Sequence, residues 1–324
     1  MLRVLSDDDV ADLLALDALL PVVADGFRAQ AEGRVERPER PHFPVGHGLA
    51  PSDPGPAGTG LTMPAYVHGR PYYATKLASV HEHATPTVKA QVALTDAATG
   101  EPVAYLDGRR LTNARTGCVG GLAAREHCGR ECGPVRVGVL GAGTQARWQA
   151  RAIATAVDVG TLRVYSPSAS RTACAAALRD ARLPAEAVDA PADAVTGADV
   201  VVTATTSRDP VFSGRALADG ALVVAVGAYT AETRELDATT LARAARVFAD
   251  VPAEAAETGD VLASDLGPAA IEPFGDVLAG ASDWAAPGEV AVVLSVGSAV
   301  LDAVAAEHLY DRAVERDAGQ VVPL

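Results

Sequence analysis

Lysine is scarce in this chain of 324 residues: Lys76 and Lys89 are the only two, and arginine supplies the rest of the 27 basic residues. The 41 acidic residues outnumber them and leave a formal net charge of -14. Because such a surface repels polyanions, nucleic acid is not an expected partner, and any phosphate must be held by local groups. An acidic, lysine-poor composition fits a high-salt cytoplasm and a GC-rich genome equally well. With so few lysines, either one is a candidate for chemistry.

Cysteine is also rare, and the four cysteines are too few and too scattered for a disulfide framework in a chain this long. They are Cys118, Cys128, Cys132 and Cys174. Cys128 and Cys132 have helical spacing, but no second pair accompanies them. His81 and His83 flank Glu82 and share one side of a strand, with no obvious third ligand. We therefore expect no metal site, and His81 is an alternative candidate for the substrate pocket.

Long hydrophobic runs are missing too, since no apolar stretch approaches the ~18 residues that span a membrane. The N-terminal segment carries acidic residues where a signal peptide carries basic ones before an apolar stretch. These features predict a cytoplasmic protein that does not insert into a membrane.

Residues 135–146 (Val-Arg-Val-Gly-Val-Leu-Gly-Ala-Gly-Thr-Gln-Ala) combine an apolar strand, a glycine turn and the start of a helix. Gly141 permits the tight turn, Gly143 lets the backbone approach a pyrophosphate, and Ala146 is small enough for helix and strand to pack. The free N–H groups of the helix favour phosphate binding. The segment is therefore interpreted as a dinucleotide-binding fingerprint, and Thr144 and Gln145 are expected cofactor contacts.

The chain before the fingerprint is long enough to form a domain of its own. A helix is expected over residues 6–32, starting at Ser6 and broken at Pro21. Antiparallel strands are expected at 60–66, 72–79, 88–96 and 103–107, and a helix at 111–128. A terminal helix over 301–317 is expected to return to this domain.

Residues from 135 onward alternate strands with alanine-rich helices, as a parallel sheet requires. Strands are expected at 135–140, 162–165, 199–204, 221–226 and 246–250. The predicted fold is α/β: a doubly wound Rossmann domain over 119–299, and an α+β substrate-binding and dimerisation domain with an antiparallel sheet over 1–118 and 300–324.

The end of the second Rossmann strand bears on which nucleotide binds. NAD-preferring folds place an Asp or Glu there to bond the ribose hydroxyls, whereas this chain has Ser166, Ser168, Ser170 and Arg171. The hydroxyls and the guanidinium suit a 2'-phosphate, so NADP(H) is favoured over NAD(H). Alternatively, the serines only cap the next helix.

Several motifs together resemble the ornithine cyclodeaminase and mu-crystallin family over nearly the whole chain. They are Met-Pro-Ala (63–65), Tyr-Tyr-Ala-Thr-Lys (72–76), Pro-Thr-Val (86–88), Thr-Gly-Glu-Pro (99–102), Leu-Asp-Gly (106–108), Leu-Thr-Asn-Ala-Arg-Thr (111–116), Ala-Asp-Val-Val-Val-Thr-Ala-Thr-Thr (198–206), Arg-Glu-Leu-Asp (234–237) and Leu-Ser-Val-Gly (294–297). The resemblance implies a nicotinamide-dependent enzyme that acts on amino acids or cyclic imines through an imino acid.

The resemblance also implies roles for individual residues. Arg115 and, less distinctly, Arg40 would clamp the substrate carboxylate, and Lys76 would act as a general acid or orient the substrate. Thr87 would lie near the nicotinamide, and Lys89 is expected to be a solvated strand residue. Further cofactor contacts are expected at Thr116, Thr205, Val226 and Gly297. Family members form dimers, and the apolar strands at 72–79 and 88–94 make a homodimer physically sensible.

One position departs from the family pattern. Ornithine cyclodeaminases carry an aspartate two residues past a glycine after the fifth strand, where this chain has Tyr229 after Gly227. A phenol is a poor base at neutral pH but can donate a hydrogen bond, which favours reduction of an imino acid or ketimine, or amino-acid dehydrogenation. Glu232 is a possible substitute base, so cyclodeamination of ornithine is the alternative. NADPH binding without turnover is a second one.

Overall fold

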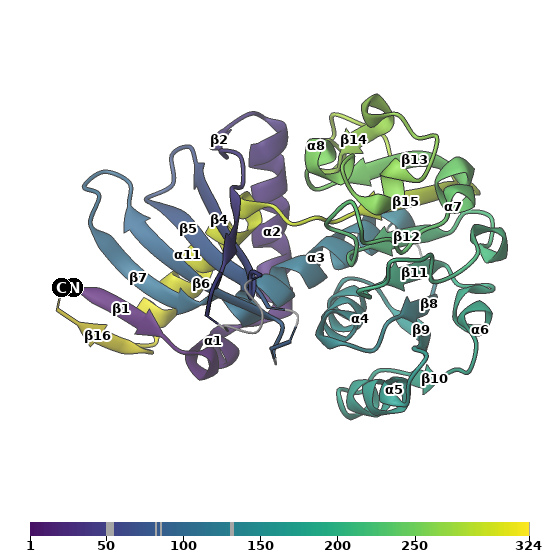
Figure 1. Ribbon diagram of the computed structural model, residues 1–324, viewed down its shortest axis with the longest axis horizontal. Helices are drawn as coiled ribbons and strands as arrows, with labels where there is room; N and C mark the ends of the chain where they lie inside the picture. Colours follow the sequence, from purple (N-terminus) through teal and green to yellow (C-terminus); the bar gives the residue numbers. More distant parts are fainter. Residues whose placement is uncertain (50–54, 82, 85, 130–132, 324) are drawn as a thin grey trace. The chain divides into compact units, whose positions relative to one another are not determined.

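The chain folds into two compact units. The structure, a computed structural model, describes residues 1–49, 55–81, 83–84, 86–129 and 133–323. Unit 1 comprises Met1–Arg115 and Ser298–Leu324, and unit 2 comprises Thr116–Gly297 (Figure 1). None of the described helices is long and apolar enough to cross a membrane.

Unit 1 is built on a mixed sheet in the order β16-β1-β7-β6-β5-β4-β2, with β3 also paired to β4. Its strands are β1 (Leu2–Leu5), β2 (Val35–Glu36), β3 (His42–Val45), β4 (Gly58–Val67), β5 (Tyr72–Val80), β6 (Val88–Asp96), β7 (Pro102–Asp107) and β16 (Gln320–Val322). The predicted antiparallel meander from β4 to β7 is confirmed. The sequence analysis missed β1, which lies parallel to β7 and antiparallel to β16.

One face of this sheet forms the core of unit 1. Along β5, Ala74 and Lys76 are buried while Tyr73 and Leu77 are exposed, which is the period of two expected of a strand with one covered face. Helix α11 (Ala299–Glu315) packs on the buried face against β4, β5 and β6, and also against α2 (Figure 1). Each fully buried aliphatic side chain in this layer contributes roughly 2 kcal/mol.

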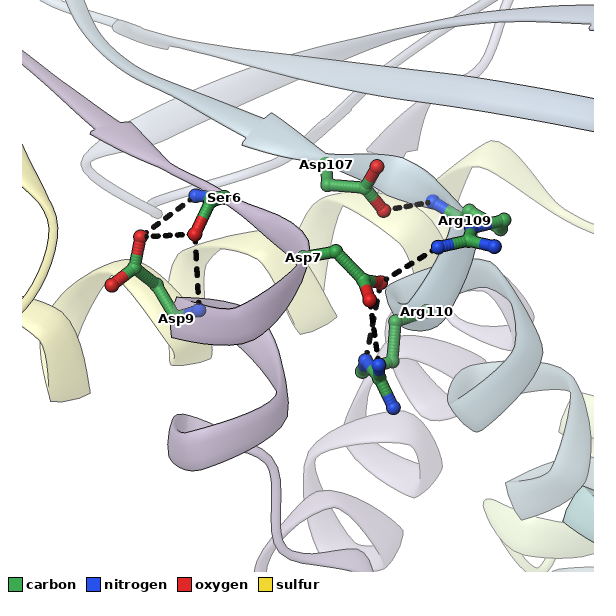
Figure 2. Close-up of polar contacts among 6 residues, drawn as sticks. All are labelled: Ser6, Asp7, Asp9, Asp107, Arg109 and Arg110. Carbon is green, nitrogen blue, oxygen red and sulfur yellow. Dashed lines mark hydrogen bonds and ion pairs between the residues drawn. The ribbon is translucent and has the colours of Figure 1, made fainter.

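The N-terminal helices differ from the prediction. Ser6 caps α1 (Asp7–Leu13) in a capping box with Asp9, as Figure 2 shows. The break falls at extended residues Leu14 and Ala15, and Pro21 lies inside α2 (Leu16–Ala31), so the predicted break at Pro21 is wrong. Proline costs this helix one backbone hydrogen bond, but the buried apolar stripe of α2 keeps the turn helical.

Helix α3 (Gly108–Cys128) begins directly after β7 and is anchored at its start to α1. Asp7 forms ion pairs with Arg110 at 2.6 Å and with Arg109 at 3.3 Å (Figure 2). Asp107 accepts a hydrogen bond from the backbone N–H of Arg109 at 3.0 Å. The start of the helix that carries Arg115 is therefore fixed by charged contacts within unit 1.

Unit 2 has an all-parallel sheet in the order β10-β9-β8-β11-β12-β15-β13-β14. Its strands are β8 (Val135–Leu140), β9 (Val159–Tyr165), β10 (Ala185–Ala187), β11 (Val200–Thr203), β12 (Leu222–Ala225), β13 (Ala244–Ala249), β14 (Ile271–Pro273) and β15 (Val290–Leu294). The predicted strands and the α/β Rossmann class are confirmed. The strand order reverses between β8 and β11, and ligands of such sheets bind at the carboxyl ends of strands at this point.

Helices connect these strands. They are α4 (Thr144–Ala156), α5 (Ser170–Asp180), α6 (Pro191–Val195), α7 (Ala238–Arg243), α8 (Pro252–Ala255), α9 (Gly259–Leu262) and α10 (Phe274–Leu278), with 3-10 turns η1 (Gly214–Ala216) and η2 (Pro268–Ala270). Strands β11, β12 and β15 are nearly continuous runs of valine, leucine and alanine, as expected for strands buried on both faces.

Candidate functional site

Three buried charged side chains meet in unit 1. The Lys76 ammonium on β5 lies 2.6 Å from Asp302 Oδ2, and Arg115 Nε on α3 lies 2.8 Å from Asp302 Oδ1. The exposed fractions of the three side chains are 3% for Lys76, 4% for Arg115 and 1% for Asp302. Two predicted residues are thus brought together by a third, Asp302 on α11, which the sequence analysis did not identify.

Each of these residues occupies a buried position of its strand or helix. Lys76 is paired across the sheet with Met63 and Val92, and Arg115 follows the buried residue Ala114 on α3. Asp302 lies in the first turn of α11, on a stretch that is buried throughout. A charged residue in a stretch where every neighbour is apolar was a signal in the sequence that could have revealed Asp302.

Burial and neighbouring charges set the proton affinities of the cluster. Burial lowers the pKa of Lys76 to about 8, helped by the positive charges of Arg115 and Arg40 and opposed by Asp302. Burial by itself would raise the pKa of Asp302, but Arg115 and Lys76 outweigh it, and the pKa is lowered. Asp302 is therefore ionised at neutral pH, while Lys76 can gain or release a proton near it.

Donors of the cluster remain available. Within the described residues, Arg115 has one hydrogen-bond acceptor, Asp302, and that acceptor uses Nε. Its Nη1 and Nη2 groups have no acceptor there, and Lys76 has only Asp302 as an ionic partner. Arg40 acts on Lys76 through its charge, which places this predicted residue in the same electrostatic environment. The arrangement suits a small carboxylate.

The fingerprint of unit 2 has the geometry that a dinucleotide needs. Gly141 has φ 114°, and a Cβ at this position would lie 2.3 Å from the Ala204 carbonyl oxygen. Gly143 is the N-cap of α4 without a side-chain cap, and a Cβ there would meet nothing within 4 Å. Thr144 and Gln145 open the helix. The first-turn N–H groups of α4 therefore lack a side-chain cap, and a pyrophosphate fits there.

The loop after β9 forms a small polar network. Ser170 Oγ lies 3.1 Å from Ser166 Oγ and 2.7 Å from Ser168 Oγ. Arg171 donates to the carbonyls of Ser166 and Ser168 and forms an ion pair with Asp189 at 2.8 Å. Asp189 follows β10, and the sequence analysis missed it because no motif links the end of β10 to the loop after β9.

Three buried carboxylates hold the loops at the carboxyl ends of the other strands. Glu235 accepts from Thr203 Oγ1 at 2.8 Å, Thr205 N at 2.6 Å and Gly227 N at 2.7 Å. Asp260 accepts from the backbone of residues 235 and 236, and Asp250 accepts from Gly297 N at 2.8 Å. The predicted residues Thr205 and Gly297 thus lie on fixed loops. None of the three carboxylates was identified from the sequence.

The other predicted residues lie after β12, between β5 and β6, and on α3. Tyr229, after β12, is 42% exposed. Thr87 lies in the exposed turn between β5 and β6, where its hydroxyl donates to the Ala84 carbonyl at 3.3 Å. Val226 is partly buried after β12, and the Thr116 carbonyl on α3 accepts from Gln149 at 2.8 Å.

The two candidate metal-binding motifs fall partly outside the described residues. Glu82 and Cys132 both lie there. Among the residues that are described, no three His, Cys, Asp or Glu side chains gather as metal ligands.

A doubly wound sheet with a glycine fingerprint is the architecture of dinucleotide-binding proteins, and unit 1 adds a buried cluster of two cations and one carboxylate. The model of the ornithine cyclodeaminase/mu-crystallin family matches residues 2–317, and the chain belongs to that family. It is 35% identical over 317 residues to a Delta(1)-pyrroline-2-carboxylate/Delta(1)-piperideine-2-carboxylate reductase of Azospirillum brasilense, covering 96% of both chains.

Two solved structures of similar proteins match nearly the whole chain. The Delta(1)-pyrroline-2-carboxylate reductase of Thermococcus litoralis, in complex with NADH and L-proline, has a TM-score of 0.90 at 25% identity, covering 99% of this chain and 100% of that one. An archaeal alanine dehydrogenase dimer with bound NAD has a TM-score of 0.87 at 26% identity, covering 99% of this chain and 98% of that one.

Proposed function

We propose that this protein is an NAD(P)H-dependent oxidoreductase that reduces an α-imino acid or cyclic ketimine to the L-amino acid. The observation that carries the proposal is the buried cluster of Lys76, Arg115 and Asp302. The cluster has two cations, Lys76 and Arg115, and one carboxylate, Asp302, so its net charge is positive. The carboxylate of one small substrate would neutralise this charge. A cyclic imino acid such as Delta(1)-pyrroline-2-carboxylate brings that carboxylate together with a basic nitrogen.

The residues of unit 1 would act on the two ends of this substrate. Arg115 would hold the carboxylate through Nη1 and Nη2, with Arg40 adding positive charge. Lys76 Nζ would give a proton to the imine nitrogen and later recover one from water, and its pKa of about 8 suits this transfer near neutral pH. Protonation makes Cα electrophilic.

When bound, a reduced nicotinamide would supply the hydride that completes the amine at Cα. The fingerprint at Gly141 and Gly143 and the uncapped start of α4 would hold its pyrophosphate.

A preference for NADP(H) is part of the proposal. Arg171 is held by two backbone carbonyls beside the Ser166 and Ser168 hydroxyls, and these groups suit a 2'-phosphate. Asp189 opposes this preference, because it occupies one edge of the guanidinium.

Cyclodeamination of ornithine is the second candidate. It requires a base where Tyr229 stands, and the possible substitute is Glu232. Hydrogen bonding from Thr230 lowers the pKa of the exposed Glu232 carboxylate, which weakens it as a base. Reduction is therefore favoured over ammonia loss.

A homodimer is proposed through the uncovered face of the unit 1 sheet. Tyr73 and Leu77 on β5 and Tyr105 on β7 are exposed by 37%, 41% and 37%. The strand registers place all three on the face opposite Lys76. Exposed aromatic and aliphatic side chains on one sheet face are typical of an interface.

The test is a substrate panel with NADPH and NADH, following the absorbance of the reduced nicotinamide. The panel contains Delta(1)-pyrroline-2-carboxylate, Delta(1)-piperideine-2-carboxylate, pyruvate with ammonia, and glyoxylate with amines. We expect turnover of a cyclic ketimine or of the pyruvate mixture. Ornithine converted to proline and ammonia without net cofactor use would support the second candidate. Cofactor binding without any turnover would indicate a binding protein and contradict the proposal.

A further inference from the structure

Asp302 is the one carboxylate that contacts both Lys76 and Arg115 among the described residues, and each of its oxygens serves one of them. It lies in the first turn of α11, where the positive end of the helix dipole stabilises a negative charge. The burial of the Asp302 carboxylate is therefore compensated by Lys76, by Arg115 and by the positive end of the α11 dipole.

The contacts determine which donors stay free. Because Asp302 takes the Nε edge of Arg115, the Nη edge stays available for a bidentate carboxylate contact. Because Asp302 holds one proton of the Lys76 ammonium, the other two stay available for substrate. Without Asp302, two buried cations would repel each other and turn away from these positions.

We propose that Asp302 is a positioning residue of the imine-reducing site: it fixes Arg115 and Lys76 in the orientation that binds substrate, and it keeps the Lys76 ammonium protonated. The inference rests on the proposed function and adds a residue that acts through two others. A buried triad of charges gives little net stability compared with apolar side chains of equal volume, so stability by itself does not account for it.

The chain permits an unusually clean test of the Lys76 part. Its only two lysines are Lys76, which is buried, and Lys89, which is exposed on β6. The rate at which acetic anhydride acetylates each lysine can be measured by mass spectrometry over a range of pH. The pH dependence of the Lys76 rate then gives the titration of Lys76, with Lys89 as an internal reference for the reactivity of the reagent. Wild-type Lys76 should titrate near its pKa of about 8.

In Asp302→Asn the carboxylate charge is lost, and the Lys76 titration should fall by about one pH unit or more. The alkaline limb of kcat for imine reduction should move down with it, kcat should fall by about 100-fold, and L-proline should bind more weakly by calorimetry. Glu307→Gln is the matched control, since it removes a carboxylate from the same helix that pairs with Arg70 instead. It should leave the titration, the pH profile and L-proline binding unchanged.

Asp302→Glu keeps the charge but moves the carboxylate by one methylene. This variant tests the positioning role of Asp302 even if Asp302→Asn does not fold. It should keep the Lys76 titration near the wild-type value while kcat falls. Wild-type kcat in Asp302→Glu, or an unchanged Lys76 titration in a folded Asp302→Asn, would overturn the proposal. The acetylation readout needs no substrate, so failure of the proposed reaction would leave this outcome distinguishable.

Discussion

The Glu235 carboxylate and Thr205 are joined by two hydrogen bonds, from the Thr205 backbone N–H at 2.6 Å and from its hydroxyl at 2.8 Å, both to Oε1. The other oxygen accepts from Thr203 and Gly227. One buried side chain thus joins the loops that follow β11 and β12. Gly227 is tightly enclosed, because a Cβ there would lie 2.5 Å from Glu235 Oε1.

Glu235 should make the stability of the protein depend on pH. Burial raises its pKa from 4.5 to about 7 despite the four donors. The folded state therefore holds this proton more tightly than the unfolded chain, and stability decreases as the pH rises from about 4.5 to about 7. The loss is on the order of 3 kcal/mol. The thermal midpoint of the wild type should fall across this pH range, whereas that of Glu235→Gln should lack this part of the pH dependence.

Exposed Glu257 provides the control for this prediction, since Glu257→Gln should follow the wild-type pH curve. A constant difference between Glu235→Gln and the wild type at every pH would show that Glu235 does not titrate in this range.

The Arg171–Asp189 pair should tune the choice of nucleotide. Asp189 is 92% exposed, so its hold on Arg171 is weak, and Asp189→Asn should tighten NADPH binding by about threefold. Arg171→Ala should weaken NADPH binding by about tenfold and change NADH binding little. Fluorescence titration with each nucleotide measures both effects.

A neighbouring ion pair serves as the control for the nucleotide prediction. Glu186 pairs with Arg163 at 3.0 Å, and Glu186→Gln should leave both affinities unchanged. Equal loss of NADH and NADPH affinity in Arg171→Ala would show that Arg171 does not discriminate between the two nucleotides.

The N-terminal anchor should contribute measurably to stability. Hydrogen bonding from Arg110 lowers the pKa of Asp7, so its contribution is present above the unfolded pKa and is lost as the pH falls through the lower folded value. At neutral pH, Asp7→Asn should cost about 1 kcal/mol of unfolding free energy, because the pairs are partly exposed. Asp8→Asn, in the same helix turn but exposed, is the control, because Asp8 shares the helix dipole and attracts Arg110 by its charge without pairing with it. Equal losses in the two variants would show that the ion pairs contribute nothing.

Local patterns were enough to predict most of the fold. The alternation along β5 and β6, the apolar strands of unit 2 and the glycine turn are written in consecutive residues, and the structure reproduces them. Pro21 misled because a proline signals a helix break locally, whereas burial of the stripe around it is decided by α11, which lies almost 300 residues further along the chain. The two-residue link at Leu14 and Ala15 contains no turn-forming residue to reveal it.

Motifs marked part of the candidate site, and an isolated charge in an apolar stretch marked Asp302, but nothing in the sequence marked the contact between them. Lys76 and Arg115 lie in motifs, but their shared partner Asp302 is 187 residues away from Arg115. Asp189 and Arg171 likewise form a contact although they follow different strands, β10 and β9. Such pairs are set by tertiary packing, and a single sequence does not carry the spacing that would reveal them.

Lys76→Met should abolish turnover while leaving NADPH binding intact, because the variant removes the proposed proton donor of unit 1 and leaves the fingerprint of unit 2 unchanged. Lys89→Met is the control and should keep wild-type kcat. Turnover at the wild-type rate in Lys76→Met would remove Lys76 from the mechanism. Loss of NADPH binding in that variant would indicate that the substitution disturbs the fold instead.

The uncovered sheet face gives the last prediction. A charge placed among Tyr73, Leu77 and Tyr105 would be buried without a partner in a dimer, so Leu77→Arg should shift the protein to monomers. Sedimentation velocity of the wild type and the variant measures this directly. Val314→Arg places the same charge on α11, where Val314 is 50% exposed, and it should leave the dimer intact. A monomeric wild type, or a Leu77→Arg variant that still sediments as a dimer, would show that this face is not the interface.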